Sequence, residues 1–162
     1  MRKVILLRFH MPSTTWKEFR VGEVKKDVSW TPCDAELPTG NLEGPTEDSN
    51  WLIPNRLLIG ASPSAGTVAR LLEAGIDVFV SLMGEYGLPA YQNSGYASSC
   101  KDIILENQLG VLFIHFPIRN FKAAPSSSLS ALVTHLISLL ETGHTLYVHC
   151  RGGHGYALDF SN

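Results

Sequence analysis

The sequence has few cysteines, no long apolar run and no strong excess of either charge sign. Its 162 residues include only Cys33, Cys100 and Cys150, an odd and sparse set that differs from the disulfide framework of a secreted domain. No apolar stretch approaches the ~20 residues that span a bilayer. The formal net charge of −2 provides no global attraction to nucleic acid or an anionic membrane. We therefore expect a cytoplasmic protein without nucleic-acid or membrane partners.

The first fifty residues differ in composition from the rest. Residues 1–26 carry seven Lys or Arg and two Glu, whereas residues 27–50 carry six acidic residues and no basic one. Apolar residues 4–7 are too few for a secretory signal, which needs roughly 7–15. Segment 31–50 contains three prolines and two glycines without periodicity, which is typical of a loop. We expect residues 1–50 to form a partly disordered N-terminal segment and loop, and 51–162 to form the folded domain.

Short apolar runs alternate with helical patterns after residue 50. The helix from Ser64 to residue 74 is expected to end at Gly75, and Ser126 or Ser127 is expected to cap another helix. The expected strands are 57–60, 77–82, 111–116 and 145–149, and the other expected helices are 97–108 and 127–141. This alternation predicts an α/β fold with a mostly parallel sheet flanked by helices. Ligands of such sheets bind beyond the carboxyl ends of the strands, so loops 83–96, 117–126 and 150–156 are expected at the site.

A cysteine followed by a glycine-rich loop stands at the end of the last expected strand. His149 and Cys150 precede Arg151-Gly-Gly-His-Gly155, which has three glycines in five residues. Such a loop can turn successive backbone N–H groups inward and form an anion-binding nest. The same field would lower the pKa of the Cys150 thiol and favour the nucleophilic thiolate. A thiolate beside an anion cradle is suited to attack on a phosphoryl group.

This loop resembles the signature of the cysteine-dependent protein-tyrosine and dual-specificity phosphatases, His-Cys-(five residues)-Arg. Residues 50–63 resemble the family's opening strand and turn, and residues 113–121 resemble the strand and loop that carry its general acid. The resemblance covers roughly residues 50–155 and implies a phosphatase-type α/β fold. It also implies phosphocysteine hydrolysis of a phosphorylated protein or other phosphomonoester, without metal or organic cofactor. Cys150 would be the nucleophile, and the phosphate-binding residues would be Arg151, Gly152, Gly153, His154 and Gly155.

Two residues depart from the family pattern. Tyr156 stands where the family has the Arg that holds two phosphoryl oxygens, and tyrosine offers one neutral donor in place of a charged planar fork. Asn120 stands at the position of the general-acid Asp, and an amide cannot protonate a leaving group. Loss of general-acid catalysis typically costs ~10²–10⁴-fold in rate. Glu85, in the neighbouring loop, is the nearest alternative carboxylate by topology.

The sequence ends seven residues after Gly155. In the family, the loop is followed by a long helix and further helices that cover the sheet, and we expect these C-terminal helices to be missing from a truncated phosphatase-like domain. Two functions therefore remain open. One is a protein-tyrosine or dual-specificity phosphatase, and the other is an impaired relative, a pseudophosphatase or truncated product that retains at most phosphate binding.

The same residues allow other interpretations. Cys150 could be a buried, inert thiol, but a glycine loop is not the usual neighbour of a core cysteine. A zinc site built from His144, His149, Cys150 and His154 is disfavoured, because adjacent strand residues point apart and no C-x-x-C pair exists. His115 is expected to be a satisfied core histidine. No Lys-Ser/Thr follows the glycines, which argues against a nucleotide triphosphatase.

Overall fold

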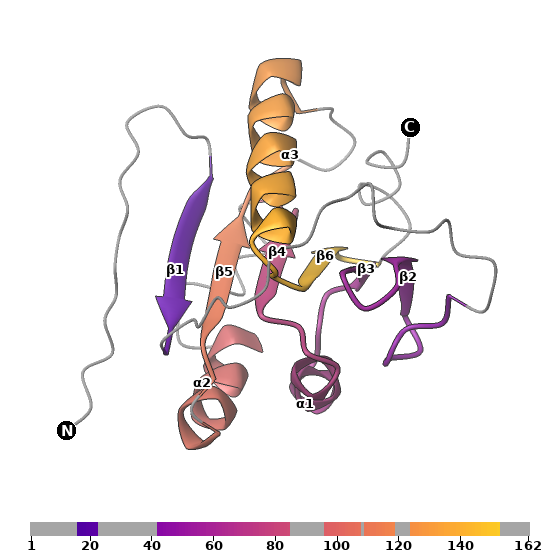
Figure 1. Cartoon of the computed structure of the whole chain (residues 1–162), viewed down its shortest axis with the longest axis vertical. Coiled ribbons are helices and arrows are strands. Elements are labelled where there is room, and N and C mark those ends of the chain that lie inside the picture. Colours follow the sequence, from indigo (N-terminus) through magenta and orange to yellow (C-terminus); the bar gives the residue numbers. More distant parts are fainter. Residues whose placement is uncertain (1–15, 23–41, 85–95, 108, 119–123, 153–162) are drawn as a thin grey trace.

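The computed structural model describes residues 16–22, 42–84, 96–107, 109–118 and 124–152 (Figure 1). Six strands and three helices lie in these ranges. They are β1 (Lys17–Val21), β2 (Ser49–Ile53), β3 (Leu57–Ala61), α1 (Ala65–Glu73), β4 (Val78–Ser81), α2 (Tyr96–Glu106), β5 (Val111–His115), α3 (Ser126–Glu141) and β6 (Leu146–Cys150). The expected α/β class is confirmed.

The strands form one six-stranded sheet in the order β1-β5-β4-β6-β3-β2. The four central strands, β5, β4, β6 and β3, are parallel, whereas β1 and β2 add antiparallel edges. Every residue of β4, β5 and β6 is buried. Strands buried on both faces are mostly apolar, which explains why these three appear in the sequence as nearly continuous apolar runs.

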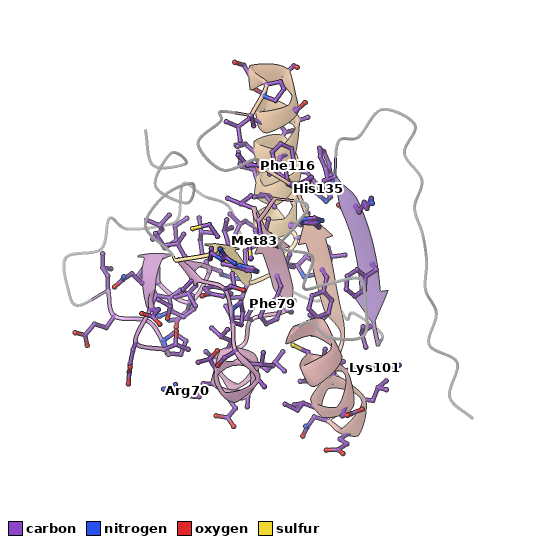
Figure 2. The ribbon with its side chains drawn as sticks, turned by 180° about the vertical axis from the view of Figure 1, so that it is seen from behind. Arg70, Phe79, Met83, Lys101, Phe116 and His135 are labelled. Carbon is purple, nitrogen blue, oxygen red and sulfur yellow. The ribbon has the colours of Figure 1, made fainter. Side chains whose placement is uncertain are left out.

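Helices cover both faces of the sheet (Figure 1). Helices α1 and α2 contact each other on one face, where they enclose a cluster that includes Val68, Leu71, Phe79, Cys100, Ile104, Phe113 and Tyr147. Helix α3 lies on the opposite face and encloses a second cluster that includes Val80, Ile114, Leu132, Leu136, Leu140 and Val148. Arg70 of α1 and Lys101 of α2 are exposed and point away from the sheet (Figure 2).

The helix ends agree with the sequence in part. Helix α1 follows Ser64, whose backbone N–H donates to Thr67 Oγ1 at 2.9 Å, and the chain turns after it at Gly75 with φ +87°, a conformation that glycine adopts without steric cost. The expected serine cap of α3 is wrong. Pro125 is the N-cap with φ −55°, since its ring fixes that angle, and its carbonyl accepts the first helical bond from the Leu129 N–H at 3.0 Å.

Strand β1 was not expected from the sequence. Its residues, Lys-Glu-Phe-Arg-Val, are mostly polar, because an edge strand buries less of its surface than a central one. Phe19 stacks on Phe113 of β5, with ring centroids 4.7 Å apart, and joins the cluster on the α1 and α2 face. Residues 17–21 thereby extend the sheet beyond β5 in antiparallel register.

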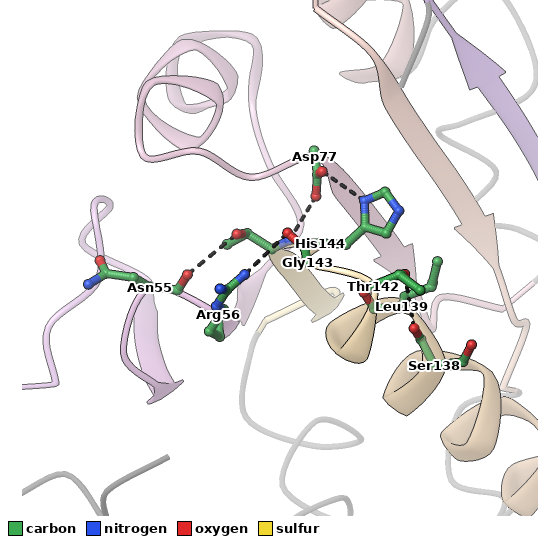
Figure 3. A network of polar contacts seen from close by, with 9 residues as sticks. Asn55, Arg56, Asp77, Ser138, Leu139, Thr142, Gly143 and His144 are labelled. Atoms are coloured by element: carbon green, nitrogen blue, oxygen red, sulfur yellow. Dashed lines mark hydrogen bonds and ion pairs between the residues drawn. The ribbon is translucent and has the colours of Figure 1, made fainter. Parts of the chain in front are cut away.

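A polar network joins the segments around the amino-terminal end of β6 (Figure 3). Asp77 accepts two hydrogen bonds of 2.8 Å, one from the His144 imidazole and one from the Thr145 backbone N–H. The Arg56 guanidinium donates to the Gly143 carbonyl at 3.2 Å. These bonds fix the turn between α3 and β6. They lie at the opposite end of β6 from Cys150.

Within the described ranges, no helix has the length and apolar character needed to cross a membrane.

Candidate active site

Cys150 is the last residue of β6, a central strand of the sheet, and it is 4% exposed. Its backbone pairs with Ala61 of β3, while the preceding His149 pairs with Gly60 on one side and Ser81 on the other. The thiol therefore stands at the carboxyl edge of the sheet, where open α/β sheets bind ligands. The sequence predicted this position correctly, because it followed from the apolar run 145–149 that leads into the glycines.

The first two residues of the glycine-rich loop run beside the exit of β3. The Ser62 N–H donates to the Arg151 carbonyl at 3.2 Å, and Ala61 forms an antiparallel bridge with Gly152. Both Arg151 and Gly152 are exposed. The β3–α1 segment thus braces the start of the loop. Of the other loop residues singled out in the sequence, Gly153, His154, Gly155 and Tyr156 lie outside the described residues.

His149, the residue before Cys150 in β6, is fully buried. Burial lowers its pKa to about 4, because the charged imidazolium is disfavoured away from water. Its Nδ1 lies 3.4 Å from the Cys150 carbonyl, and its ring stacks on Tyr147 with centroids 5.6 Å apart. A neutral, enclosed imidazole cannot exchange protons with a substrate in solution, so its position suits a structural partner of the strand end.

A buried polar row crosses three strands below this edge, and sequence reasoning missed its central member, Ser81. Ser81 pairs with His115 of β5 and with His149 of β6, and all three are at most 2% exposed. His115 Nε2 donates to the Met83 carbonyl at 2.8 Å, which confirms the expected core histidine. The alternation of apolar residues with Ser and His near strand ends was the available signal.

Two loops begin at this row. The Phe116 N–H donates to the Ser81 carbonyl at 2.9 Å, and the Ile118 N–H donates to the Leu82 carbonyl at 3.2 Å. The segments that leave β4 and β5 therefore start side by side at the carboxyl edge, next to β6. This arrangement agrees with the expected grouping of loops at one edge. Asn120 and Glu85, the two candidate positions in those loops, lie outside the described residues.

Cys100 and His144, both among the described residues, belong to other parts of the domain. Burial raises the pKa of the Cys100 thiol to about 12, which keeps it in the unreactive protonated form. His144 bonds to Asp77 before β6 begins, roughly 20 Å from Cys150 along an extended strand. Among the residues that the structure describes, no group of three His, Cys, Asp or Glu side chains could hold a metal ion. Cys33 and His154 are not among those residues.

Comparisons with known proteins identify relatives of this fold and sequence. The chain is 26% identical over 113 residues to "Putative tyrosine phosphatase 067L" of Invertebrate iridescent virus 3, and the match covers 66% of this chain and 41% of that protein. This chain thus matches less than half the length of that relative. A crystal structure of a mutant form of Tk-PTP superposes with a TM-score of 0.52 and 19% identity, covering 68% of this chain and 65% of that one. That likeness concerns the fold alone.

The family comparison covers most of the chain and includes the cysteine loop. Residues 46–157 match the model described as PTP-SAK, Swiss Army Knife protein, DSP-PTPase phosphatase domain. The match begins just before β2 and extends past Cys150, so it contains the central strands and the loop that follows them. The chain therefore belongs to the PTP-SAK family of DSP-type protein-tyrosine phosphatase domains.

Proposed function

We propose that this domain binds phosphomonoesters, such as a phosphorylated protein, at the Cys150 loop and hydrolyses them through a phosphocysteine. The observation that supports this most directly is the position of Cys150 at the carboxyl end of β6, beside the exit of β3. The carboxyl edge is where parallel sheets bind ligands, and the loop that begins there is rich in glycine. We further propose that residues 51–162 form the domain that carries this chemistry, with β1 as an addition to its sheet.

The proposed reaction has two displacements at phosphorus. The Cys150 thiolate attacks phosphorus and forms a sulfur–phosphorus bond while the ester oxygen–phosphorus bond breaks. The departing oxygen takes a proton from solvent, because Asn120 cannot supply one. A water molecule then attacks the phosphocysteine and gives up a proton to solvent, the sulfur–phosphorus bond breaks, and phosphate and the thiolate are released. The proposed cradle for the phosphoryl oxygens is the backbone of Arg151, Gly152, Gly153, His154 and Gly155, which is the anion-nest arrangement expected of a glycine-rich turn.

A second candidate function is phosphate binding with little turnover. Tyr156 in place of Arg removes a charged, bidentate partner of the phosphoryl oxygens, and Asn120 in place of Asp removes the proton donor. Backbone N–H groups do not depend on either side chain. A pseudophosphatase of this kind would keep the cradle and lose most of the rate. Because the phosphocysteine chemistry needs a reduced thiol and three cysteines are too few for a disulfide framework, we propose a reducing compartment, the cytoplasm.

Alkylation of Cys150 tests whether the site binds phosphate. Carboxymethylation by iodoacetate is followed by mass spectrometry on the Cys150 and Cys100 peptides, at pH 6, with and without inorganic phosphate or vanadate. We expect Cys150 to react and to be protected by both anions. Cys100 should stay unreactive in either case, because its pKa is raised to about 12. Equal rates at both thiols, unaffected by either anion, would refute a phosphate site at Cys150.

Hydrolysis of p-nitrophenyl phosphate separates the two candidate functions. This ester has a good leaving group, so Asn120 should matter little and the effect of Tyr156 should dominate. Anion protection together with turnover that Cys150→Ser abolishes supports the phosphatase. Anion protection without turnover supports the pseudophosphatase. Turnover as fast as that of a phosphatase with the complete His-Cys-(five residues)-Arg loop would show that Tyr156 does not disable the site.

A further inference from the structure

Tyr147 lies in β6, three residues before Cys150, and is 1% exposed. Its ring packs in the cluster on the α1 and α2 face, edge-on to Phe79 with centroids 6.1 Å apart. Its hydroxyl donates a hydrogen bond to the Ala61 carbonyl of β3. A buried tyrosine usually finds such a partner. Here the partner is the residue that pairs with Cys150.

The path of this hydroxyl requires glycine at position 60. A Cβ placed on Gly60 would lie 2.5 Å from the Tyr147 hydroxyl oxygen and 2.4 Å from the Asp48 carbonyl oxygen. Both distances are far below van der Waals contact. Gly60 therefore leaves the space through which the Tyr147 side chain reaches the neighbouring carbonyl. Any larger residue at position 60 of β3 would therefore collide with the Tyr147 hydroxyl of the adjacent strand β6.

The Ala61 backbone is held from several sides. Its N–H donates to the Asp48 carbonyl at 3.1 Å, while its carbonyl accepts from Tyr147. The same residue bridges Gly152, and the next N–H, that of Ser62, donates to the Arg151 carbonyl at 3.2 Å. A displacement of Ala61 would therefore be transmitted to Arg151 and Gly152, the first residues after the thiol.

We propose that Tyr147 is a positioning residue for the Cys150 loop and acts through the Ala61–Ser62 backbone. This inference rests on the proposed function, because it assigns a purpose to the geometry of that loop. Tyr147 does not touch substrate, since its side chain is enclosed by the sheet and by α1 and α2 packing. Burial also raises its pKa, so the phenol stays protonated and remains a donor at every working pH.

The test compares Tyr147→Phe with Thr145→Val. Tyr147→Phe removes only the hydroxyl and keeps the ring. Thr145→Val removes a hydroxyl that donates to the Asn55 carbonyl at 3.4 Å, just before the opposite end of the same strand. Both variants lose one bond between a side-chain hydroxyl and a carbonyl, but only one of these bonds adjoins the loop. All measurements are made on the full chain at temperatures where each variant is folded.

Two readouts at Cys150 are followed on its peptide by mass spectrometry. The first is the phosphate concentration that halves alkylation, and Tyr147→Phe should raise it about tenfold, the effect of one ordinary hydrogen bond felt fully at the site. The second is the pH midpoint of alkylation without phosphate. It should rise by about half to one pH unit, because a displaced loop stabilises the thiolate less. Thr145→Val should leave both readouts at the wild-type values.

The outcomes separate this proposal from the proposed function. If Tyr147→Phe and Thr145→Val lower the melting temperature but leave both readouts unchanged, Tyr147 is merely structural and the positioning role is overturned. If phosphate does not protect the wild-type chain, yet Tyr147→Phe alone shifts the pH midpoint, positioning stands and the phosphate site fails. Gly60→Ala provides a second variant: wherever it folds, it should shift the pH midpoint in the same direction as Tyr147→Phe, and an unshifted midpoint would count against the proposal.

Discussion

The indole of Trp16 stacks on the imidazole of His135, with ring centroids 5.6 Å apart and ring planes inclined by 22°. The same indole lies near Phe116, with centroids 6.4 Å apart, and its Nε1–H donates to Glu18 Oε1 at 2.8 Å. His135 is a residue of α3, and Figure 2 shows it near Phe116. Trp16 thus joins the start of β1 to α3 and to the residue that follows β5.

Trp16→Ala should destabilise the domain by about 1–3 kcal/mol, the usual range for loss of a partly buried contact. The reason is that the substitution removes both ring contacts and the bond to Glu18 in one step. Urea denaturation provides the measurement. Ile137→Ala is the control. Ile137 lies on α3, the helix that Trp16 contacts, but it is 41% exposed, so its substitution should change stability by no more than about 0.5 kcal/mol. Equal effects of the two variants would mean that β1 unfolds independently of the sheet.

Glu18 should stabilise the domain only while its carboxyl group is ionised. Burial by itself would raise its pKa, but the contacts from His135 and Trp16 outweigh burial and hold the pKa below its usual value. His135 Nε2 lies 2.6 Å from Glu18 Oε1. A carboxylate with a lowered folded-state pKa contributes stability that is complete above its unfolded pKa, about 4.3, and is lost as pH falls through the folded value.

Glu18→Gln should therefore destabilise the domain at pH 7, and this penalty should shrink as the pH falls below about 4.3, the unfolded-state pKa. Denaturant titrations across this range give the measurement. Glu141→Gln is the matched control, because Glu141 is exposed at the end of α3 and should change stability little at any pH. A Glu18→Gln penalty that stays constant down to pH 3 would show that the pairing does not involve the ionised carboxylate.

The domain should lose stability as the pH falls from about 6.5 to about 4, because His149 is buried in its neutral form. Its folded-state pKa is lowered to about 4 by burial, whereas an unfolded histidine titrates near 6.5. The unfolded chain therefore binds more protons in this window, and the free energy of unfolding falls as pH falls, by up to about 1.4 kcal/mol per pH unit. His149→Gln should flatten this slope relative to wild type. Identical slopes in denaturant titrations would contradict a neutral, buried His149.

The fold was largely predictable because its central strands and helices have strong periodic or apolar patterns. Helix α3 and strands β4, β5 and β6 were expected within one or two residues of their observed bounds. Strand β1 was missed because an edge strand alternates weakly and three of its five residues are charged. The prediction of a serine cap for α3 was wrong. Serine is preferred at an N-cap because its side chain can accept a backbone hydrogen bond, whereas Pro125 starts this helix through its fixed φ.

Only those features of the site that depend on neighbouring residues in the sequence could be predicted. Cys150 could be assigned to a strand end from residues 145–155 alone. The bridge from Ala61 to Gly152 and the bond from Tyr147 to Ala61 could not be predicted, since they join residues 91 and 86 positions apart in sequence. Such contacts depend on strand order in the sheet, and local patterns do not encode that order. Ser81 was visible as a polar residue near a strand end, but its pairing with His115 and His149 was not, for the same reason.

Tyr156→Arg should raise the turnover of p-nitrophenyl phosphate by roughly 10² or more, the usual effect of one donor that stabilises transition-state charge. The guanidinium would supply the charged, two-pronged partner that Tyr156 does not provide. The measurement is kcat/KM at fixed pH. Tyr156→Lys is the control, because it restores charge without the planar fork and should recover less. No gain from either variant, in a chain whose Cys150 is protected by phosphate, would show that the missing Arg does not limit the rate.

Asn120→Asp should act on substrates with poor leaving groups and spare those with good ones. A carboxylic acid at this position can protonate the departing oxygen, so kcat/KM for phenyl phosphate should rise by roughly 10²–10⁴ in the Tyr156→Arg background. Turnover of p-nitrophenyl phosphate should change by less than about tenfold, because its leaving group needs no proton. The new activity should also fall at high pH, where the aspartate is ionised. An equal gain on both esters would indicate a general effect on the loop and would exclude Asn120 as the position of the missing acid.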